Sequence, residues 1–367
     1  MQSIWNKYAQ LLTQYSLKLK KGERLYIKST TLAEPLVREV YREAMKLGAH
    51  VEYTLDFKGM APIFYHEANK DQLKYINLLT EASTRDFDAY LYIRAPFNLK
   101  EQQGIDQKKV DAKRKAMESI NKIYFERTAS GDLKRSLCQF PTDANAQEAG
   151  MSYEEYCDFI FGACKLDQPD PIKAWKALGK KQQKIVDFLN QKQNIRYVTE
   201  GTDIRFNTTG RQWINSDGTA NMPSGEVFTA PVEDSVEGHI RFSYPAIYMG
   251  HEVEGVELKV EKGEIVSWDA QKGKDFLDKI FIIPGSRRFG EAAIGTNYGV
   301  QKITKNILFD EKIGGSIHMA IGQSYKQCGG ENESAIHWDM ITDMKASGQI
   351  FADDELIYEK GKFIVEL

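Results

Sequence analysis

The hydrophobic pattern of this 367-residue chain changes near residue 195, and this change constrains the fold more than any other feature. Before it, short apolar runs alternate with helical periodicity. The runs 25–27, 51–55 and 89–93 predict strands, and a helical pattern over 36–47 lies between the first two. Strands separated by helices are typical of a mostly parallel sheet that helices cover. The first half is therefore predicted to be α/β.

After the change the chain is rich in short strands. The segments 203–207 and 354–367 alternate apolar and polar residues near glycine-containing turns, whereas 273–280 has a helical pattern. Short strands joined by tight turns form antiparallel sheets. We therefore expect an α/β N-terminal domain over 1–195 with a mostly parallel sheet, and a strand-rich α+β catalytic domain over 196–367.

Composition and charge exclude several classes of protein. The 49 basic and 52 acidic residues give a formal charge of −3, which supplies no field that would attract a nucleic-acid backbone. No stretch is apolar for long enough to span a bilayer, and residues 1–23 lack the continuous apolar region of a signal peptide. The four cysteines form no CxxC pair, and no phosphate-binding glycine loop is present. We expect a cytoplasmic protein with no nucleic acid, membrane or nucleotide cofactor as partner.

Histidines in the second half have spacings that suit a metal site. His337 and Asp339 are two residues apart, so on a strand both side chains would point to the same face and could chelate an ion. His318 lies in an apolar run, where a histidine is more often a packed core residue than a ligand. The residues alone therefore favour the packing interpretation for His318.

Three glutamates, Glu226, Glu291 and Glu311, lie in similarly apolar or glycine-rich segments. A buried charge needs a partner or a metal, and for each glutamate separately a structural salt bridge is the simpler explanation. Together with Asp339 they would supply about four negative charges, which balance two divalent ions, and histidine adds nitrogen ligands suited to zinc, cobalt or manganese. This combination fits a dinuclear hydrolase.

The segments around these residues resemble the aminopeptidase T and aminopeptidase S group of dinuclear metallo-aminopeptidases, also described as thermophilic metalloprotease-like. The similar segments occur in the same order and span both halves of the chain: 141–152, 221–239, 290–297, 309–311, 315–325 and 333–340. The resemblance implies peptide substrates, a homodimer and a site that is reached through an internal cavity.

Carried onto this sequence, the resemblance implies six metal ligands and an active-site tyrosine, Tyr325. The ligands are Glu226, Glu291, Glu311, His318, His337 and Asp339. Two divalent ions, zinc, cobalt or manganese, would activate a water that releases N-terminal amino acids from peptides. Glu291 is also expected to act as the general base, and Tyr325 to donate a hydrogen bond to the oxyanion. Without the resemblance, Tyr325 would be taken for a packing residue.

Two other functions remain compatible with the pattern. A ring-cleaving iron dioxygenase on the same scaffold would need two histidines and one carboxylate, and could dispense with the extra glutamates. A metal-free binding protein would keep the fold alone. The acidic residues Glu233, Asp234 and Glu237 would either bind the substrate ammonium or form an exposed loop, and Cys328 close to the site could alter its sensitivity to oxidation.

Overall fold

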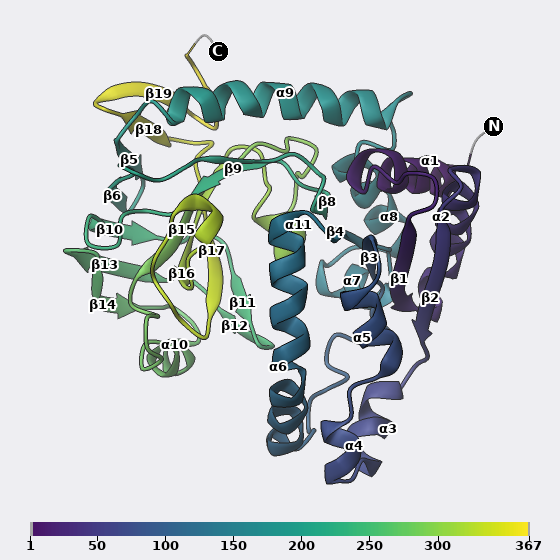
Figure 1. The fold of residues 1–367 in the computed structure, drawn as a ribbon. Coiled ribbons are helices and arrows are strands. Elements are labelled where there is room, and N and C mark those ends of the chain that lie inside the picture. Colours follow the sequence, from purple (N-terminus) through teal and green to yellow (C-terminus); the bar gives the residue numbers. More distant parts are fainter. Residues whose placement is uncertain (1–2, 366–367) are drawn as a thin grey trace. The chain divides into compact units, whose positions relative to one another are not determined.

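The computed structural model describes residues 3–365, which form two compact units (Figure 1). The first contains the residues up to 161 together with 166–172 and 219–222, and the second contains the others. The division into domains at residue 195 stays a prediction. Within the described part of the chain, no helix combines the length and the apolar composition needed to cross a membrane.

The first unit is built on a sheet of five parallel strands, in which the order is β2-β1-β3-β4-β8. The three strands expected from apolar runs are present, and the α/β prediction with a parallel sheet is confirmed. No hydrophobic pattern had indicated β4 or the short β8. The strands are β1 (Arg24–Thr30), β2 (His50–Asp56), β3 (Ala89–Arg94), β4 (Lys134–Gln139) and β8 (Asn221–Met222).

One helix of the first unit follows the apolar pattern of its sequence closely. Helix α2 (Glu34–Lys46) has a proline in its first turn and buries one stripe that includes Val40 and Ala44. Gly48, with φ of +75°, follows its end. The other helices are α1 (Ile4–Gln10), the π-helix η1 (Leu11–Ser16), the 3₁₀-helix η2 (Thr31–Ala33), α3 (Met60–Glu67), α4 (Lys70–Lys74), α5 (Leu78–Arg85), α6 (Gln107–Ser130), α7 (Asp143–Glu148) and α8 (Tyr153–Ala163).

The second unit contains an eight-stranded antiparallel sheet with the order β14-β13-β10-β6-β5-β18-β19-β20. Its strands are β5 (Asn194–Thr199), β6 (Thr202–Asn207), β10 (Glu237–Arg241), β13 (Glu257–Glu261), β14 (Glu264–Asp269), β18 (Gln349–Ala352), β19 (Glu355–Glu359) and β20 (Lys362–Phe363). A separate hairpin pairs β11 (Ala246–Tyr248) with β12 (His251–Val253).

A second antiparallel sheet of five strands, β17-β16-β15-β9-β7, carries five of the six predicted ligands. Its strands are β7 (Ile214–Ser216), β9 (Glu226–Thr229), β15 (Phe289–Gly295), β16 (Ser316–Gly322) and β17 (His337–Asp343). The helices of this unit are α9 (Pro171–Leu189), α10 (Lys274–Ile280), α11 (Ile307–Asp310) and the 3₁₀-helix η3 (Lys326–Cys328). The strand-rich α+β prediction is therefore confirmed, and α10 is the helix expected from its sequence.

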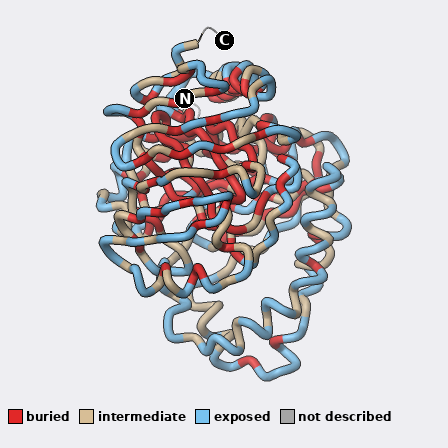
Figure 2. Tube along the Cα trace, turned by 90° about the vertical axis from the view of Figure 1, so that its left-hand side faces the viewer, coloured by how far each residue is buried: buried red, intermediate tan, exposed pale blue. Residues whose placement is uncertain are grey.

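The two antiparallel sheets share one hydrophobic core, which helix α9 also contributes to. Side chains such as Tyr197 and Ile204 come from the large sheet, while Ile294, Met319 and Met340 come from alternate positions of the small one. Figure 2 shows buried residues concentrated in the strands. Every residue of β9, β15 and β16 is buried, so both faces of these strands are covered. One face forms the core, and the other forms the candidate site.

Candidate metal centre

The alternation of side chains along β15, β16 and β17 places three predicted ligands on one face of the small sheet. Glu291 pairs with Ala320, and Ala320 pairs with Asp339, so the two carboxylates flank a methyl group in one row across three strands. In the next row on the same face, His337 pairs with Gly322. The small residues on the central strand leave space between the acidic and imidazole side chains.

His318 and Glu226 join the same face from the other direction. His318 lies two residues before Ala320 on β16 and is paired with Ala293 on β15. Glu226 is the first residue of β9 and pairs with Gly295, which also lies two positions from Ala293. The opposite face of these strands packs into the core. Because side chains alternate between the two faces of a strand, the predicted ligands lie on one face and the core residues on the other.

Glu311 comes from a loop rather than from the sheet. It is the C-cap residue of the short helix α11, whose N-cap Asn306 accepts a hydrogen bond from the backbone N–H of Leu308. The buried carboxylate of Asp310 accepts hydrogen bonds from the N–H and hydroxyl of Thr304, each at 2.8 Å. These contacts fix the turn that directs Glu311 toward the sheet.

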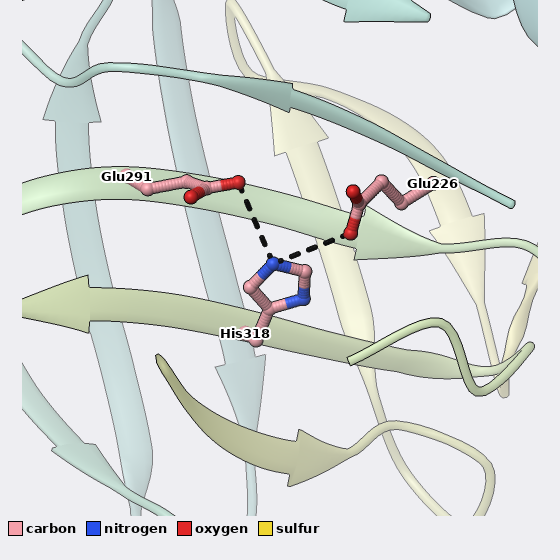
Figure 3. Close-up of side chains that lie close together, drawn as sticks. All are labelled: Glu226, Glu291 and His318. Atoms are coloured by element: carbon pink, nitrogen blue, oxygen red, sulfur yellow. Dashed lines mark ion pairs between the residues drawn. The ribbon is translucent and has the colours of Figure 1, made fainter. Parts of the chain in front are cut away.

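The six predicted ligands form three overlapping groups in which one ligand atom of each residue lies within 4.8 Å of the others. His318 Nε2 lies 3.5 Å from Glu226 Oε2 and 3.6 Å from Glu291 Oε1 (Figure 3). The groups share members, so they describe one continuous cluster. Their residues are Glu226, Glu291 and His318; Glu291, His337 and Asp339; and Glu311, His318 and Asp339.

The ring of His337 is held by the main chain. Its Nδ1 lies 2.7 Å from the carbonyl oxygen of Gln323, and because a carbonyl only accepts, Nδ1 must carry the proton. Nε2 is then free to ligate, and it lies 3.1 Å from Glu291 Oε2 and 3.5 Å from Asp339 Oδ1. Gly290 permits this arrangement, since a Cβ at that position would lie 2.4 Å from the Gln323 carbonyl oxygen. A hydrogen bond of this kind fixes the ring orientation of metal-binding histidines.

Several polar atoms of the cluster are buried without a hydrogen-bond partner among the described residues. They include Glu226 Oε2, His337 Nε2 and Asp339 Oδ1, which converge on the same region. A buried polar atom with no partner costs about 1–3 kcal/mol, and more for a charged group, so a concentration of them in one place needs a ligand. Oxygen and imidazole nitrogen donors suit a divalent cation of the zinc, cobalt or manganese type. The residues present therefore fit a metal centre.

Electrostatic coupling within the cluster shifts the pKa values in opposite directions. Burial opposes ionisation of Glu291 and Asp339, but contacts with the two histidines outweigh it and lower both pKa values. Burial disfavours the imidazolium of His318, yet Glu291 and the other carboxylates raise its pKa to about 9, and that of His337 also lies well above its usual value. Burial raises the pKa of Glu311 to about 8. Protons and metal ions thus compete for the same atoms.

This competition predicts that divalent metal affinity rises with pH between about pH 6 and 9. A metal binds only the deprotonated ligand, so the apparent dissociation constant should fall about tenfold per pH unit for each proton displaced. Calorimetric titration in buffers of different ionisation enthalpy measures that number of protons. His251→Gln, which changes a ring stacked on Phe276 outside the cluster, should show the same slope as the unaltered protein. An affinity independent of pH would contradict the prediction.

Lys312 is a site residue that the sequence reasoning missed. Its side chain is 2% exposed, and its ammonium contacts Glu226 Oε1 and lies 2.5 Å from Glu311 Oε1. Burial disfavours the ammonium, but these two carboxylates raise the pKa of Lys312 above its usual value, so it stays charged. The signal was present in the sequence, because Lys312 precedes the same apolar, glycine-rich run that made His318 notable.

Tyr325 lies beside the cluster, at the start of η3. Its ring packs edge-on against Phe228 and is 4.9 Å from the ring of His337, while 41% of the residue is exposed. Partial removal from water, together with the negative charges of Glu291 and Asp339, raises the pKa of Tyr325 well above its usual value. The phenol therefore keeps its proton at neutral pH and can donate a hydrogen bond.

The segment that carries Tyr325 is anchored by an ion pair. Glu233 pairs with Arg211 and also accepts hydrogen bonds from the backbone N–H groups of Glu331, at 2.7 Å, and Asn332. These contacts occupy the carboxylate of Glu233, so it is not a free receptor for the substrate ammonium. Cys328 on the same segment is buried, and burial raises the pKa of its thiol to about 12, which makes it unreactive.

Comparison with known proteins shows to which family the chain belongs. The family model described as thermophilic metalloprotease (M29) matches residues 1–363. The chain belongs to the M29 metalloprotease family. It is 28% identical over 347 residues to Aminopeptidase 2 of Geobacillus stearothermophilus, covering 87% of this chain and 83% of that protein. It is also 28% identical over 409 residues to Aminopeptidase AmpS of Bacillus subtilis, covering 98% of each.

A solved structure has the same fold along nearly the whole chain. Wild-type AmpT from Thermus thermophilus superposes with a TM-score of 0.85 at 25% identity, covering 99% of each chain. The resemblance deduced from sequence segments is therefore confirmed. As a member of the M29 family the chain is a metal-dependent peptidase, and the buried carboxylate and imidazole cluster is where its residues fit a divalent metal.

Proposed function

We propose that this protein is a two-metal aminopeptidase that releases amino acids from the N-termini of peptides. The observation that carries the proposal is the arrangement of Glu291, whose two oxygens face different histidines, His318 at 3.6 Å and His337 at 3.1 Å. Glu291 would thus belong to two groups of ligands, one with Glu226 and His318 and the other with His337 and Asp339. The relatives named above are aminopeptidases, which supports cleavage from the N-terminus.

The proposed ligands are the six clustered residues, which would hold two divalent ions of zinc, cobalt or manganese: Glu226, Glu291, Glu311, His318, His337 and Asp339. When bound, such ions would lower the pKa of a water and polarise the scissile carbonyl. The gathering of all three glutamates at one place favours this set over the two-histidine, one-carboxylate site of an iron dioxygenase. The two aminopeptidase relatives lend that alternative no support.

The protein residues would supply proton transfer and positioning. Glu291, buried between both histidines, would take the proton of the attacking water and pass it to the leaving amine. Tyr325, with a protonated phenol and an exposed surface, would donate a hydrogen bond to the oxyanion of the tetrahedral intermediate. We further propose a homodimer, which the resemblance to this family implies, and a cytoplasmic location, which the presence of the cysteines as thiols favours.

A peptide with a free α-amine and its N-acetylated counterpart test the proposal directly. The free peptide should lose residues one at a time from its N-terminus, while the acetylated peptide should react at least about tenfold more slowly, because acetylation deletes the ammonium that positions the scissile bond. Mass spectrometry of timed digests measures both.

Chelation supplies the matching control for the metal requirement. Exhaustive removal of divalent ions should abolish cleavage, and zinc, cobalt or manganese should restore it. Equal cleavage of the two peptides, or internal cuts first, would refute the aminopeptidase assignment. Full activity without metal would refute the metal centre, and elemental analysis that finds no metal in the purified protein would favour a binding protein.

A further inference from the structure

A fully buried lysine joins two carboxylates of the candidate centre that belong to distant parts of the chain. Lys312 and Glu226 are 86 residues apart in sequence, and the ammonium bridges Glu226 on β9 to Glu311 at the end of α11. Lysines are almost never fully buried unless they are paired. The pairing here is double, and both partners are proposed metal ligands.

The ammonium of Lys312 contacts only one of the two carboxylate oxygens of Glu226. One oxygen, Oε1, contacts Lys312, while the other, Oε2, lies 3.5 Å from His318 Nε2 and has no hydrogen-bond partner among the described residues. The same carboxylate can therefore contact the ammonium and a metal ion at once. Lys312 fixes one oxygen and leaves the second directed toward the centre.

The positive charge of Lys312 lies close to only two of the four carboxylates, those of Glu226 and Glu311. In the described structure, no lysine or arginine lies within 4 Å of the carboxylates of Glu291 or Asp339, which face His337 instead. With the four carboxylates ionised and both imidazoles neutral, as metal binding requires, the ammonium leaves the cluster with three negative charges rather than four. The part of the centre around His318, with which Glu226 and Glu311 are each grouped, is therefore the part that is partly neutralised.

We infer that Lys312 is a positioning residue that holds Glu226 and Glu311 together before metal binds and that lowers the affinity for an ion at His318, with which each of these carboxylates is grouped. The inference rests on the ligand set proposed above. Two adjacent carboxylates repel each other in a low-dielectric interior, and the ammonium offsets this repulsion. The same positive charge repels a divalent ion at that position. A group that stabilises the metal-free protein more than the loaded protein weakens metal binding by the difference in free energy.

Lys312→Met tests the inference, because methionine has a similar length and no charge. At about pH 8.5, where protons compete less, the metal-free variant should melt at least about 5 °C lower than the unaltered protein. Saturation with cobalt should reduce that difference by at least about half. Calorimetric titration should show one class of ion binding at least about tenfold more tightly and the other unchanged. An equal loss of stability with and without metal, or weaker binding of both ions, would overturn the inference.

Two further variants keep the test decisive. If Lys312→Met does not fold without metal, the double variant Lys312→Met, Glu311→Gln is used. It should restore the metal-free melting temperature, because it removes a carboxylate that has lost its ammonium partner. A double variant that still fails to fold would show that Lys312 contributes packing alone. Lys305→Met, which breaks a more exposed pair with Glu252 at 3.1 Å, should change melting slightly and equally in both states.

The two proposals fail in different ways. Unaltered protein that binds no divalent ion would refute the ligand set, and the proposed function with it. Unaltered protein that binds two ions, with the same two affinities in Lys312→Met, would refute only the role of Lys312.

Discussion

Glu291→Gln should lower kcat/KM for peptide cleavage by about 10³-fold or more while the protein still folds. Glutamine keeps the shape of the side chain and an oxygen donor, but it cannot accept the proton of the attacking water. The residual activity should also lose the rise with pH that ionisation of a general base produces. Steady-state kinetics across pH, with metal content measured by elemental analysis, checks the prediction.

A matched control separates this effect from a general change in charge. Glu264→Gln neutralises an exposed carboxylate on β14 of the same unit, and it should leave kcat/KM within about twofold of the unaltered value. If Glu291→Gln retained full metal content and more than a tenth of the activity, Glu291 would be a ligand only, and another group would have to accept the proton.

Tyr325→Phe should reduce kcat by about 10²-fold with little change in metal content or melting temperature. The substitution keeps the ring that packs against Phe228 and removes only the hydroxyl. A hydrogen bond made to the oxyanion in the transition state affects kcat, whereas a contact made equally to the bound substrate affects KM.

The control for Tyr325→Phe is a variant that removes the hydroxyl of a different tyrosine, Tyr244. Tyr244→Phe removes a hydrogen bond to Asp343 at the end of β17, 2.7 Å long, so it perturbs the same sheet without touching the proposed oxyanion position. It should lower stability slightly and leave kcat unchanged. A near-normal kcat in Tyr325→Phe would return Tyr325 to a packing role.

The fold class could be predicted from periodicity because each half of the chain has a consistent local pattern. Apolar runs marked β1, β2 and β3, and the helix between β1 and β2 was bounded by a glycine. Strand β8 was missed because it is two residues long and pairs with β4, which precedes it by more than 80 residues. Local patterns report on which face a strand buries and not on which strand it joins.

The site was less accessible to reasoning from residues alone. The spacing of His337 and Asp339 correctly placed both on one face, but His318 remained ambiguous, since a buried histidine looks the same in sequence whether it packs or ligates. Lys312 was overlooked because buried charge was sought among carboxylates only. The carbonyl of Gln323 has no sequence signature at all, because every residue carries one.

The way His337 is oriented has a consequence for directed evolution of this centre. Its hydrogen-bond acceptor is a main-chain carbonyl, so a library that randomises polar side chains near the site leaves the tautomer of His337 unchanged. The space for that carbonyl comes from the absence of a side chain at Gly290. Gly290→Ala is therefore the substitution expected to displace this carbonyl and, with it, to change the orientation of the His337 ring.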